Sequence, residues 1–244
     1  CNLGRETAIQ KVEWRDDDWL YLTNGGNEPN EQVQPPPLEP CPWDELPKTL
    51  PFDSPHFAIP RGPSSSVIIE PDGLKLVGME SLESNFEQAM LARRLTSQRL
   101  TATTKLSFQP ENFQQMAGMA AYYNTYLFHY LYLSNDEERG LCLQIHSCDD
   151  GSSTFPLGPE IVPVTGGPLY LRAIFDDSPL EFQFSHDGEH FKKVGPTLDA
   201  SILSDDHGKH WGFTGTFIAL ACQDLSGNKL PAFFHHLETT PNAS

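Results

Sequence analysis

Residues 117–134 have the sequence AGMAAYYNTYLFHYLYLS, and residues 141–146 continue with LCLQIH. Both segments are rich in aromatic and aliphatic side chains over lengths that suit β-strands. Asn124 and Thr125 interrupt the first segment with residue types that favour a turn. The stretch therefore predicts strands that are joined by a turn and contribute heavily to a hydrophobic core.

Further runs of strand length lie on both sides of this stretch, with turn residues between them. They are residues 67–70, 74–77, 101–108, 169–175, 180–185, 216–222 and 232–237. No helical period intervenes; only residues 83–94 hint at a helix, and we expect a strand there. Alternating strand faces must be buried against a second sheet, so the fold class is all-β, an antiparallel β-sandwich closed as a jelly roll.

Residues 185–191, SHDGEHF, predict a hairpin in this sandwich. Asp187 and Gly188 are the pair that supplies the positive φ angles of such a turn. A ligand-binding loop is the alternative for the same residues. The hairpin is the interpretation that the pattern favours.

The first 63 residues have a different character from the sandwich. Residues 7–14 and 19–22 predict two strands joined by the charged turn at 15–18, and residues 25–63, with three consecutive prolines, predict a stiff Pro-rich linker. An isolated hairpin is marginally stable, so residues 1–24 should belong to a sheet whose other strands precede them. We therefore expect the C-terminal piece of a longer polypeptide, with the sandwich over residues 64–240.

Composition and charge narrow the classes of partner. The 244 residues are 38% hydrophobic and 11% aromatic, which is enough apolar mass for a core, and the formal net charge is −17. A net negative charge of this size repels phosphate backbones and anionic lipid surfaces. Nucleic acids and membranes are therefore excluded as expected partners, whereas a second copy of the chain remains open.

The cysteines show no pattern of a metal or redox site. Cys1, Cys41, Cys142, Cys148 and Cys222 contain no C-x-x-C pair. An odd, sparse count favours free thiols and a cytoplasmic over a secreted chain, although the compartment stays undetermined. Cys142 and Cys222 lie in apolar runs, where we expect small buried hydrophobic residues.

Acidic pairs and histidines offer no specific catalytic or metal signature. Four acidic clusters at residues 16–18, 149–150, 176–177 and 205–206 lie at expected turns, where aspartates are solvated and cap neighbouring amides. Calcium binding by residues 149–150 together with 176–177 is the alternative, because loop oxygens suit that ion, but no EF-hand spacing is present. No nucleotide-binding glycine motif occurs either. We expect no cofactor.

The six aromatic residues between Tyr122 and Tyr132 allow two interpretations. Stacking on sugar rings requires several of them on one exposed face. Core packing is favoured, because strand alternation directs half of them inward.

Five segments carry a resemblance to a known family. They are GRETAIQKVEW at 4–14, FQQMAG at 113–118, LDASILSD at 198–205, FTG at 213–215 and CQDLSG at 222–227. Together they resemble the C-terminal half of a β-xylosidase of glycoside hydrolase family 43, over nearly the whole chain from Leu3 to Leu237. The resemblance implies a five-bladed β-propeller upstream, of which residues 1–24 are the end, followed by a concanavalin A-like β-sandwich.

The resemblance implies two site residues and places the catalytic carboxylates outside this chain. Arg5 matches an arginine that binds substrate in the propeller pocket, and its alternative is an ion pair with Glu6 or a neighbouring blade. Phe213 matches an aromatic residue that closes the pocket from the sandwich, and its alternative is an ordinary core residue. Trp211, just before it, departs from the family pattern.

The implied function is that of an inverting, exo-acting β-xylosidase, with arabinofuranosides as further substrates. The upstream propeller and a xylo-oligosaccharide are the implied partners, no metal is implied, and the segment alone is expected to be inactive. Two alternatives are a free-standing carbohydrate-binding module and a purely structural or oligomerising domain.

Overall fold

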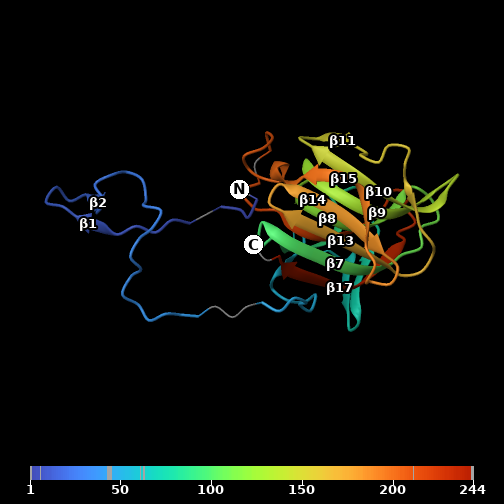
Figure 1. Cartoon of the computed structure of the whole chain (residues 1–244), viewed down its shortest axis with the longest axis horizontal. Coiled ribbons are helices and arrows are strands. Elements are labelled where there is room, and N and C mark those ends of the chain that lie inside the picture. Colours follow the sequence, from blue (N-terminus) through green and yellow to red (C-terminus); the bar gives the residue numbers. More distant parts are fainter. Residues whose placement is uncertain are drawn as a thin grey trace. The chain divides into compact units, whose positions relative to one another are not determined.

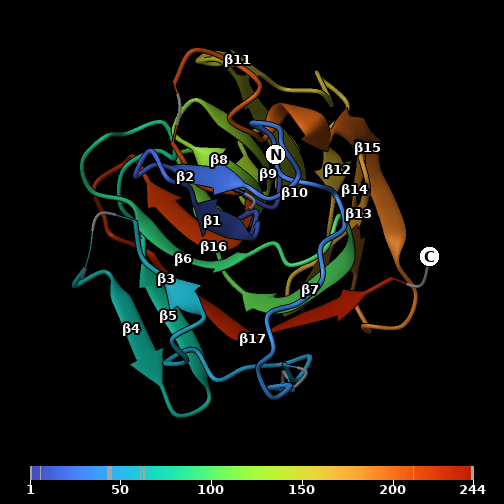
Figure 2. The same cartoon turned by 90° about the vertical axis from the view of Figure 1, so that its left-hand side faces the viewer.

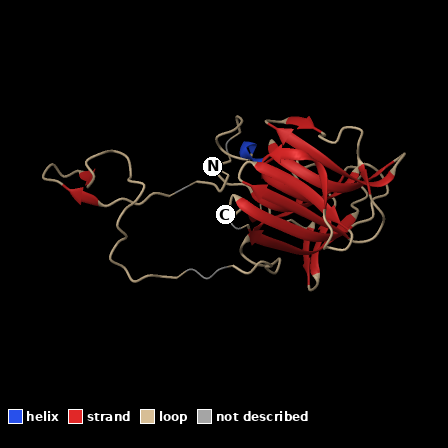
Figure 3. Ribbon diagram, viewed as in Figure 1, coloured by secondary structure: helices blue, strands red, loops and turns tan. Residues whose placement is uncertain are grey.

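The computed structural model describes residues 2–5, 7–42, 46–60, 62, 64–210 and 212–242. It divides into a smaller unit, Arg5–Leu46, and a larger unit made of Cys1–Gly4 and Pro47–Ser244. Among the described residues, strands dominate and the one helical element is a short 3-10 turn, η1, at Ala200–Ile202 (Figure 3). No helix in these residues is long and apolar enough to cross a membrane.

One sheet of the larger unit has eight strands in the described part of the chain. Their spatial order is β11-β10-β9-β8-β16-β6-β3, and β12 pairs with β10. The bounds are Phe57–Ala58 for β3, Ala89–Arg94 for β6, Gln115–Asn124 for β8, Leu127–Asp136 for β9, Gly140–Asp149 for β10, Ser152–Thr154 for β11, Val162–Pro163 for β12 and Phe217–Asp224 for β16. All pairings are antiparallel.

The second sheet has seven strands in the order β15-β14-β13-β7-β17-β5-β4. The bounds are Val67–Glu70 for β4, Gly73–Val77 for β5, Arg99–Ser107 for β7, Leu169–Asp176 for β13, Pro179–Ser185 for β14, Lys192–Asp199 for β15 and Pro231–Pro241 for β17. Figure 1 shows β7, β13, β14, β15 and β17 side by side, and Figure 2 shows β4 and β5 as a hairpin at the edge of this sheet.

The hydrophobic core lies between the two sheets, as the predicted sandwich requires. Along β7 and β13 every second residue is buried, so that Leu106 and Leu171 face the interior while Thr103 and Arg172 face outward. The expectation that residues 83–94 contain a strand is confirmed by β6.

The aromatic stretch of β8 and β9 is buried on both faces of its sheet. Leu131 and Leu133 belong to the main core, whereas Phe128, Tyr130 and Tyr132 form a second apolar cluster with Leu82 from the segment before β6. Tyr130 is fully buried. The interpretation as core packing is confirmed, and these rings do not form an exposed sugar-stacking face.

The predicted hairpin at 185–191 is confirmed. It joins β14, which ends at Ser185, to β15, which begins at Lys192. Gly188 has a φ of 81°, whereas Asp187 does not have a positive φ. The sequence pattern did not predict β15 as a strand, because this edge strand holds Pro196 and Gly195, and a register shift interrupts its pairing with β14.

The smaller unit contains the predicted N-terminal hairpin. Strand β1, Val12–Trp14, pairs antiparallel with β2, Leu20–Leu22, and Asp18 in the turn has a φ of 62°. Trp14 and Trp19 are exposed in this unit. A two-stranded ribbon with apolar side chains exposed to this extent is typical of part of a larger sheet.

Besides Cys1–Gly4, the larger unit contains the residues from Pro47 onward, including the segment that precedes residue 64. Leu50 and Phe52 are buried, and Phe57 pairs with Arg93 of β6. The isolated apolar residues of this segment carry no strand period, so their contribution depends on contacts with distant strands. The described cysteines are free thiols; Cys142, Cys148 and Cys222 are buried, and Cys41 is exposed.

Candidate functional site

The loop between η1 and β16, residues 203–216, presents Phe213 to solvent. Phe213 is 60% exposed, so the alternative that it is an ordinary core residue is wrong. Its backbone has a φ of 51°, a left-handed conformation that is uncommon for a bulky residue. A costly backbone conformation combined with an exposed aromatic side chain is typical of a functional position.

A carboxylate fixes this backbone conformation. Asp205 Oδ1 accepts a hydrogen bond from the amide nitrogen of Phe213 at 3.0 Å and from the hydroxyl of Tyr123. The same hydroxyl oxygen accepts a hydrogen bond from the amide of Gly212 at 2.8 Å. Two consecutive amides of the loop are therefore held by side chains, one from Asp205 at the start of the same loop and one from Tyr123 of β8.

Tyr123 connects this junction to the core. It is a buried residue of β8, and its ring belongs to the main hydrophobic cluster. Burial, followed by the hydrogen bond to Asp205, raises the pKa of Tyr123 to about 12. The phenol therefore stays protonated and donates to Asp205 at any physiological pH.

The tip of the loop is tied to the turns at the ends of β8 and β10. His207 Nε2 lies 2.7 Å from Asp149 Oδ1, and the Lys209 amide donates to Asp150 Oδ1 at 3.0 Å. The ring of His210 stacks on Tyr126 with a centroid separation of 3.7 Å. These contacts hold the loop along its length.

The end of the loop is tied to the first residues of the chain. The Thr216 amide donates to the carbonyl oxygen of Asn2 at 2.7 Å, and the Asn2 side chain donates to the carbonyl oxygen of Ala200 at 2.5 Å. A Cβ atom on Gly215 would lie 2.6 Å from the nitrogen of Gly4, so the two backbones approach more closely than a side chain permits. Residues 2–4 are thus part of the same unit as Phe213.

Arg5, the other predicted site residue, begins the smaller unit and is exposed. Its substrate-binding role therefore stays a prediction. Glu6, the ion-pair partner considered for Arg5, and Trp211 lie outside the described residues.

The acidic pairs act as caps and surface ion pairs in the part of the chain that the structure describes. Asp176 and Asp177 flank Arg99, with shortest separations of 3.2 and 2.7 Å, and Asp150 caps the Lys209 amide. No group of three or more His, Cys, Asp or Glu side chains in the described residues is arranged to hold a metal ion. The pairs at 149–150 and 176–177 bind different cationic side chains.

Sequence reasoning missed the two residues that orient Phe213. Asp205 was expected to be a solvated turn residue that caps amides, and it does cap one, but nothing indicated that the amide belongs to Phe213. Tyr123 lies 82 positions from Asp205 in the chain. No local pattern could reveal a contact between residues so far apart.

Two antiparallel sheets packed face to face define a concanavalin A-like β-sandwich, and the loop 203–216 connects one sheet to the other. The chain belongs to the family described as β-xylosidase C-terminal concanavalin A-like domain, whose model matches residues 51–240.

Curated relatives carry the similarity over almost the whole chain. It is 38% identical over 247 residues to a β-xylosidase of Bacillus subtilis (strain 168), covering 97% of this chain and 46% of the relative. It is 39% identical to a xylosidase/arabinosidase 43B of Humicola insolens, covering 99% of this chain and 47% of the relative.

A solved structure of a xylan β-1,4-xylosidase from Bacillus halodurans C-125 superimposes with a TM-score of 0.91 at 39% identity, covering 98% of this chain and 48% of that one. The chain therefore spans about half the length of the proteins that it resembles.

Proposed function

We propose that this chain forms the C-terminal part of an inverting, exo-acting β-xylosidase that releases terminal xylose from β-1,4-linked xylo-oligosaccharides. The proposal is supported by family membership and by a curated relative that is named a β-xylosidase. Arabinofuranosides are proposed as further substrates, in line with the xylosidase/arabinosidase among those relatives.

The sandwich has a definite role in this proposal: it completes the wall of the substrate pocket with Phe213. The observation that carries this role is the exposed ring on a backbone held by Asp205 and Tyr123. A rigid aromatic wall excludes water and orients a sugar ring without first having to be ordered. A wall of this kind also closes a shallow funnel at one end, which limits cleavage to chain ends.

Hydrolysis with inversion needs one carboxylic acid that protonates the leaving oxygen and one carboxylate that activates water. We place both groups in an upstream propeller domain, the end of which is the β1–β2 hairpin. Arg5 contributes to substrate binding there, because its planar guanidinium donates several hydrogen bonds in a fixed geometry. This chain by itself is then expected to be inactive.

The proposal is tested with the full-length protein that contains this chain. Incubation with xylobiose should release xylose, and NMR should show the α-anomer as the first product, because inversion of a β-linkage gives α. This chain alone should release none. A correctly folded full-length protein without activity, or with the β-anomer as first product, would contradict the proposal.

The pocket-wall role is tested separately by Phe213→Ala in the full-length protein. We expect kcat/KM for xylobiose to fall at least tenfold, about 1.4 kcal/mol of transition-state stabilisation. Phe86→Ala is the matched control, since Phe86 is also an exposed phenylalanine of the larger unit. Equal kinetics for wild type and Phe213→Ala would exclude this role.

A free-standing carbohydrate-binding module was the alternative that depended on exposed aromatic residues between Tyr122 and Tyr132. Tyr122, Tyr123, Tyr130 and Tyr132 are buried. That face therefore gives the alternative no support.

A further inference from the structure

A groove of about 350 Å³ lies on the outer face of the seven-stranded sheet. Side chains from β7, β13 and β17 line it, together with the turn between β14 and β15. The lining residues include Thr103, Tyr170, Arg172, Gly188, Glu238 and Thr240. The volume is within the range of small-molecule sites, and the lining residues are half-buried.

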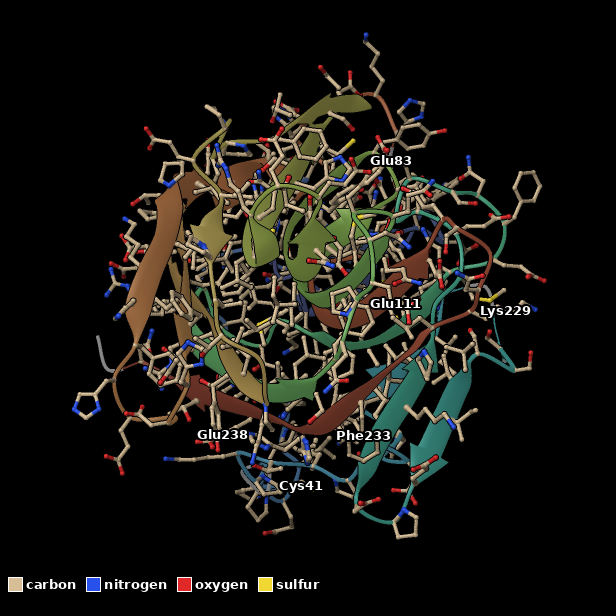
Figure 4. All side chains as sticks on the ribbon, turned by 90° about the vertical axis from the view of Figure 1, so that its right-hand side faces the viewer. Cys41, Glu83, Glu111, Lys229, Phe233 and Glu238 are labelled. Carbon is tan, nitrogen blue, oxygen red and sulfur yellow. The ribbon has the colours of Figure 1, made fainter. Side chains whose placement is uncertain are left out.

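Strand register places the acidic residue Glu238 and the basic residue Arg172 on opposite sides of Thr103. Thr103 of β7 is paired with Glu238 of β17 on one side and with Arg172 of β13 on the other. Neighbouring strands are spaced by about 4.8 Å, so the two charged residues stand roughly 10 Å apart at their Cα atoms. No ion pair between them is found in the described chain. Glu238 projects from β17 on the same side as Phe233, away from the packed interior (Figure 4).

Arg172 is held in a fixed orientation. Its guanidinium carbon lies 3.3 Å from the ring centroid of Phe191, and its Nε donates to Thr103 Oγ1 at 3.1 Å. The terminal amino groups of Arg172 make no hydrogen bond to the described residues. They are therefore available as immobilised donors.

An aromatic residue forms the neighbouring part of the groove. Tyr170 packs against the turn at Gly188, where a Cβ atom would lie 3.0 Å from the tyrosine ring. Asp187 orders this turn by accepting hydrogen bonds from the amides of Glu189 and His190, both at 2.8 Å. The hydroxyl of Tyr170 has no hydrogen-bond partner among the described residues.

The groove therefore combines donors and acceptors that are half-buried and not paired with one another. Arg172 and Tyr170 supply donors, whereas Glu238 and the hydroxyl of Thr240 supply acceptors without a described hydrogen-bond partner. An acid opposite a base suits a neutral ligand better than a polyanion, which the overall charge of −17 also disfavours. A polar lining that also contains the rings of Tyr170 and His236 suits a polyhydroxylated ligand and not a lipid.

We propose that this groove binds a segment of a neutral β-1,4-linked xylose chain, which gives the sandwich a carbohydrate contact besides Phe213. The choice of xylose rests on the proposed function. A second contact on the same polymer would raise the local concentration of substrate chains at the enzyme.

The test uses titration calorimetry of the full chain with xylohexaose. Glu238→Gln and Tyr170→Ala should each weaken binding at least fivefold. Glu181→Gln is the matched control, because Glu181 lies on the same sheet outside the groove and is paired with Lys193, and it should bind as the wild type does. Thermal melting checks that every variant is folded.

No binding of xylohexaose at millimolar concentration, or equal binding by both groove variants and wild type, would overturn the proposal. Loss of binding in Phe213→Ala alone would do the same, because it would place the sugar at the other loop. Binding through the groove together with an inactive full-length protein would support the groove proposal and refute the proposed xylosidase activity. Xylose release without binding at the groove would refute the groove proposal and leave the proposed xylosidase activity supported.

Discussion

The amide of Phe213 donates a hydrogen bond to Asp205 Oδ1 at 3.0 Å, and this oxygen also accepts the hydroxyl of Tyr123. One carboxylate thus joins the backbone of an exposed aromatic residue to a tyrosine in the core. The left-handed conformation of Phe213 is stabilised by this link, because an unfavourable backbone angle persists only where neighbouring groups enforce it.

Asp205→Ala should reduce activity through Phe213. In the full-length protein, we expect kcat/KM for xylobiose to fall roughly tenfold. The double variant with Phe213→Ala should lose little more than Phe213→Ala alone, because both changes remove the same oriented ring. Asp176→Ala, a surface aspartate beside Arg99, should be neutral. Additive losses in the double variant would show that Asp205 acts independently of the ring.

Phe213→Gly and Phe213→Ala should differ in stability. Both remove the ring, but glycine adopts a φ of 51° without the steric penalty that alanine retains. We expect the glycine variant to be more stable by about 1 kcal/mol in urea unfolding. A glycine variant that is less stable than the alanine variant would contradict a strained backbone at this position.

Gly118→Ala should strongly destabilise the sandwich. A Cβ atom at Gly118 would meet the carbonyl oxygen of Leu131 at 2.0 Å and the Cα atom of Tyr132 at 2.8 Å, both on the neighbouring strand. Since backbone atoms of a central strand cannot move aside easily, we expect a loss of about 4 kcal/mol or failure to fold. Gly166→Ala is the control, because no atom lies within 4 Å of a Cβ atom there. Wild-type melting of Gly118→Ala would refute the close strand approach.

The described cysteines should differ in the rate at which their thiols react. Cys41 is exposed, whereas Cys148 and Cys222 are buried, and burial raises the pKa of Cys148 to about 11. The thiolate is the reactive form, so alkylation at pH 8 should modify Cys41 quickly and Cys148 and Cys222 only on unfolding. Peptide mass mapping checks this. Rapid modification of Cys148 in folded protein would show that its surroundings open readily.

Alkaline pH should weaken the Tyr123 junction. The pKa of Tyr123 is about 12 in the folded chain and near 10 when unfolded, so its contribution to stability is complete below pH 10 and is lost as the pH rises through 12. Wild type should therefore lose more unfolding free energy between pH 9 and pH 11 than Tyr123→Phe. Parallel profiles for the two proteins would argue against the shifted pKa.

Some of this architecture was visible in the local sequence. The alternation in residues 101–108 and 169–175 predicted strands with one buried face, and Asp187-Gly188 predicted the hairpin that joins β14 to β15. These features depend on neighbouring residues alone. By contrast, Leu50 and Phe52 carry no period, and their burial follows from packing against strands far along the chain.

The amino-acid sequence by itself determined most of the long strands, though not β15, and it determined the N-terminal hairpin and, through its family resemblance, the choice of Arg5 and Phe213. Strand period and turn chemistry act over a few residues, so they can be read locally. Only the tertiary structure decided that Asp205 and Tyr123 orient Phe213, and that Glu238, Thr103 and Arg172 share one row across a sheet. Asp205 and Phe213 are eight positions apart in one loop, but the other contacts join residues tens of positions apart. Strand order and register, rather than local preference, bring those distant residues together.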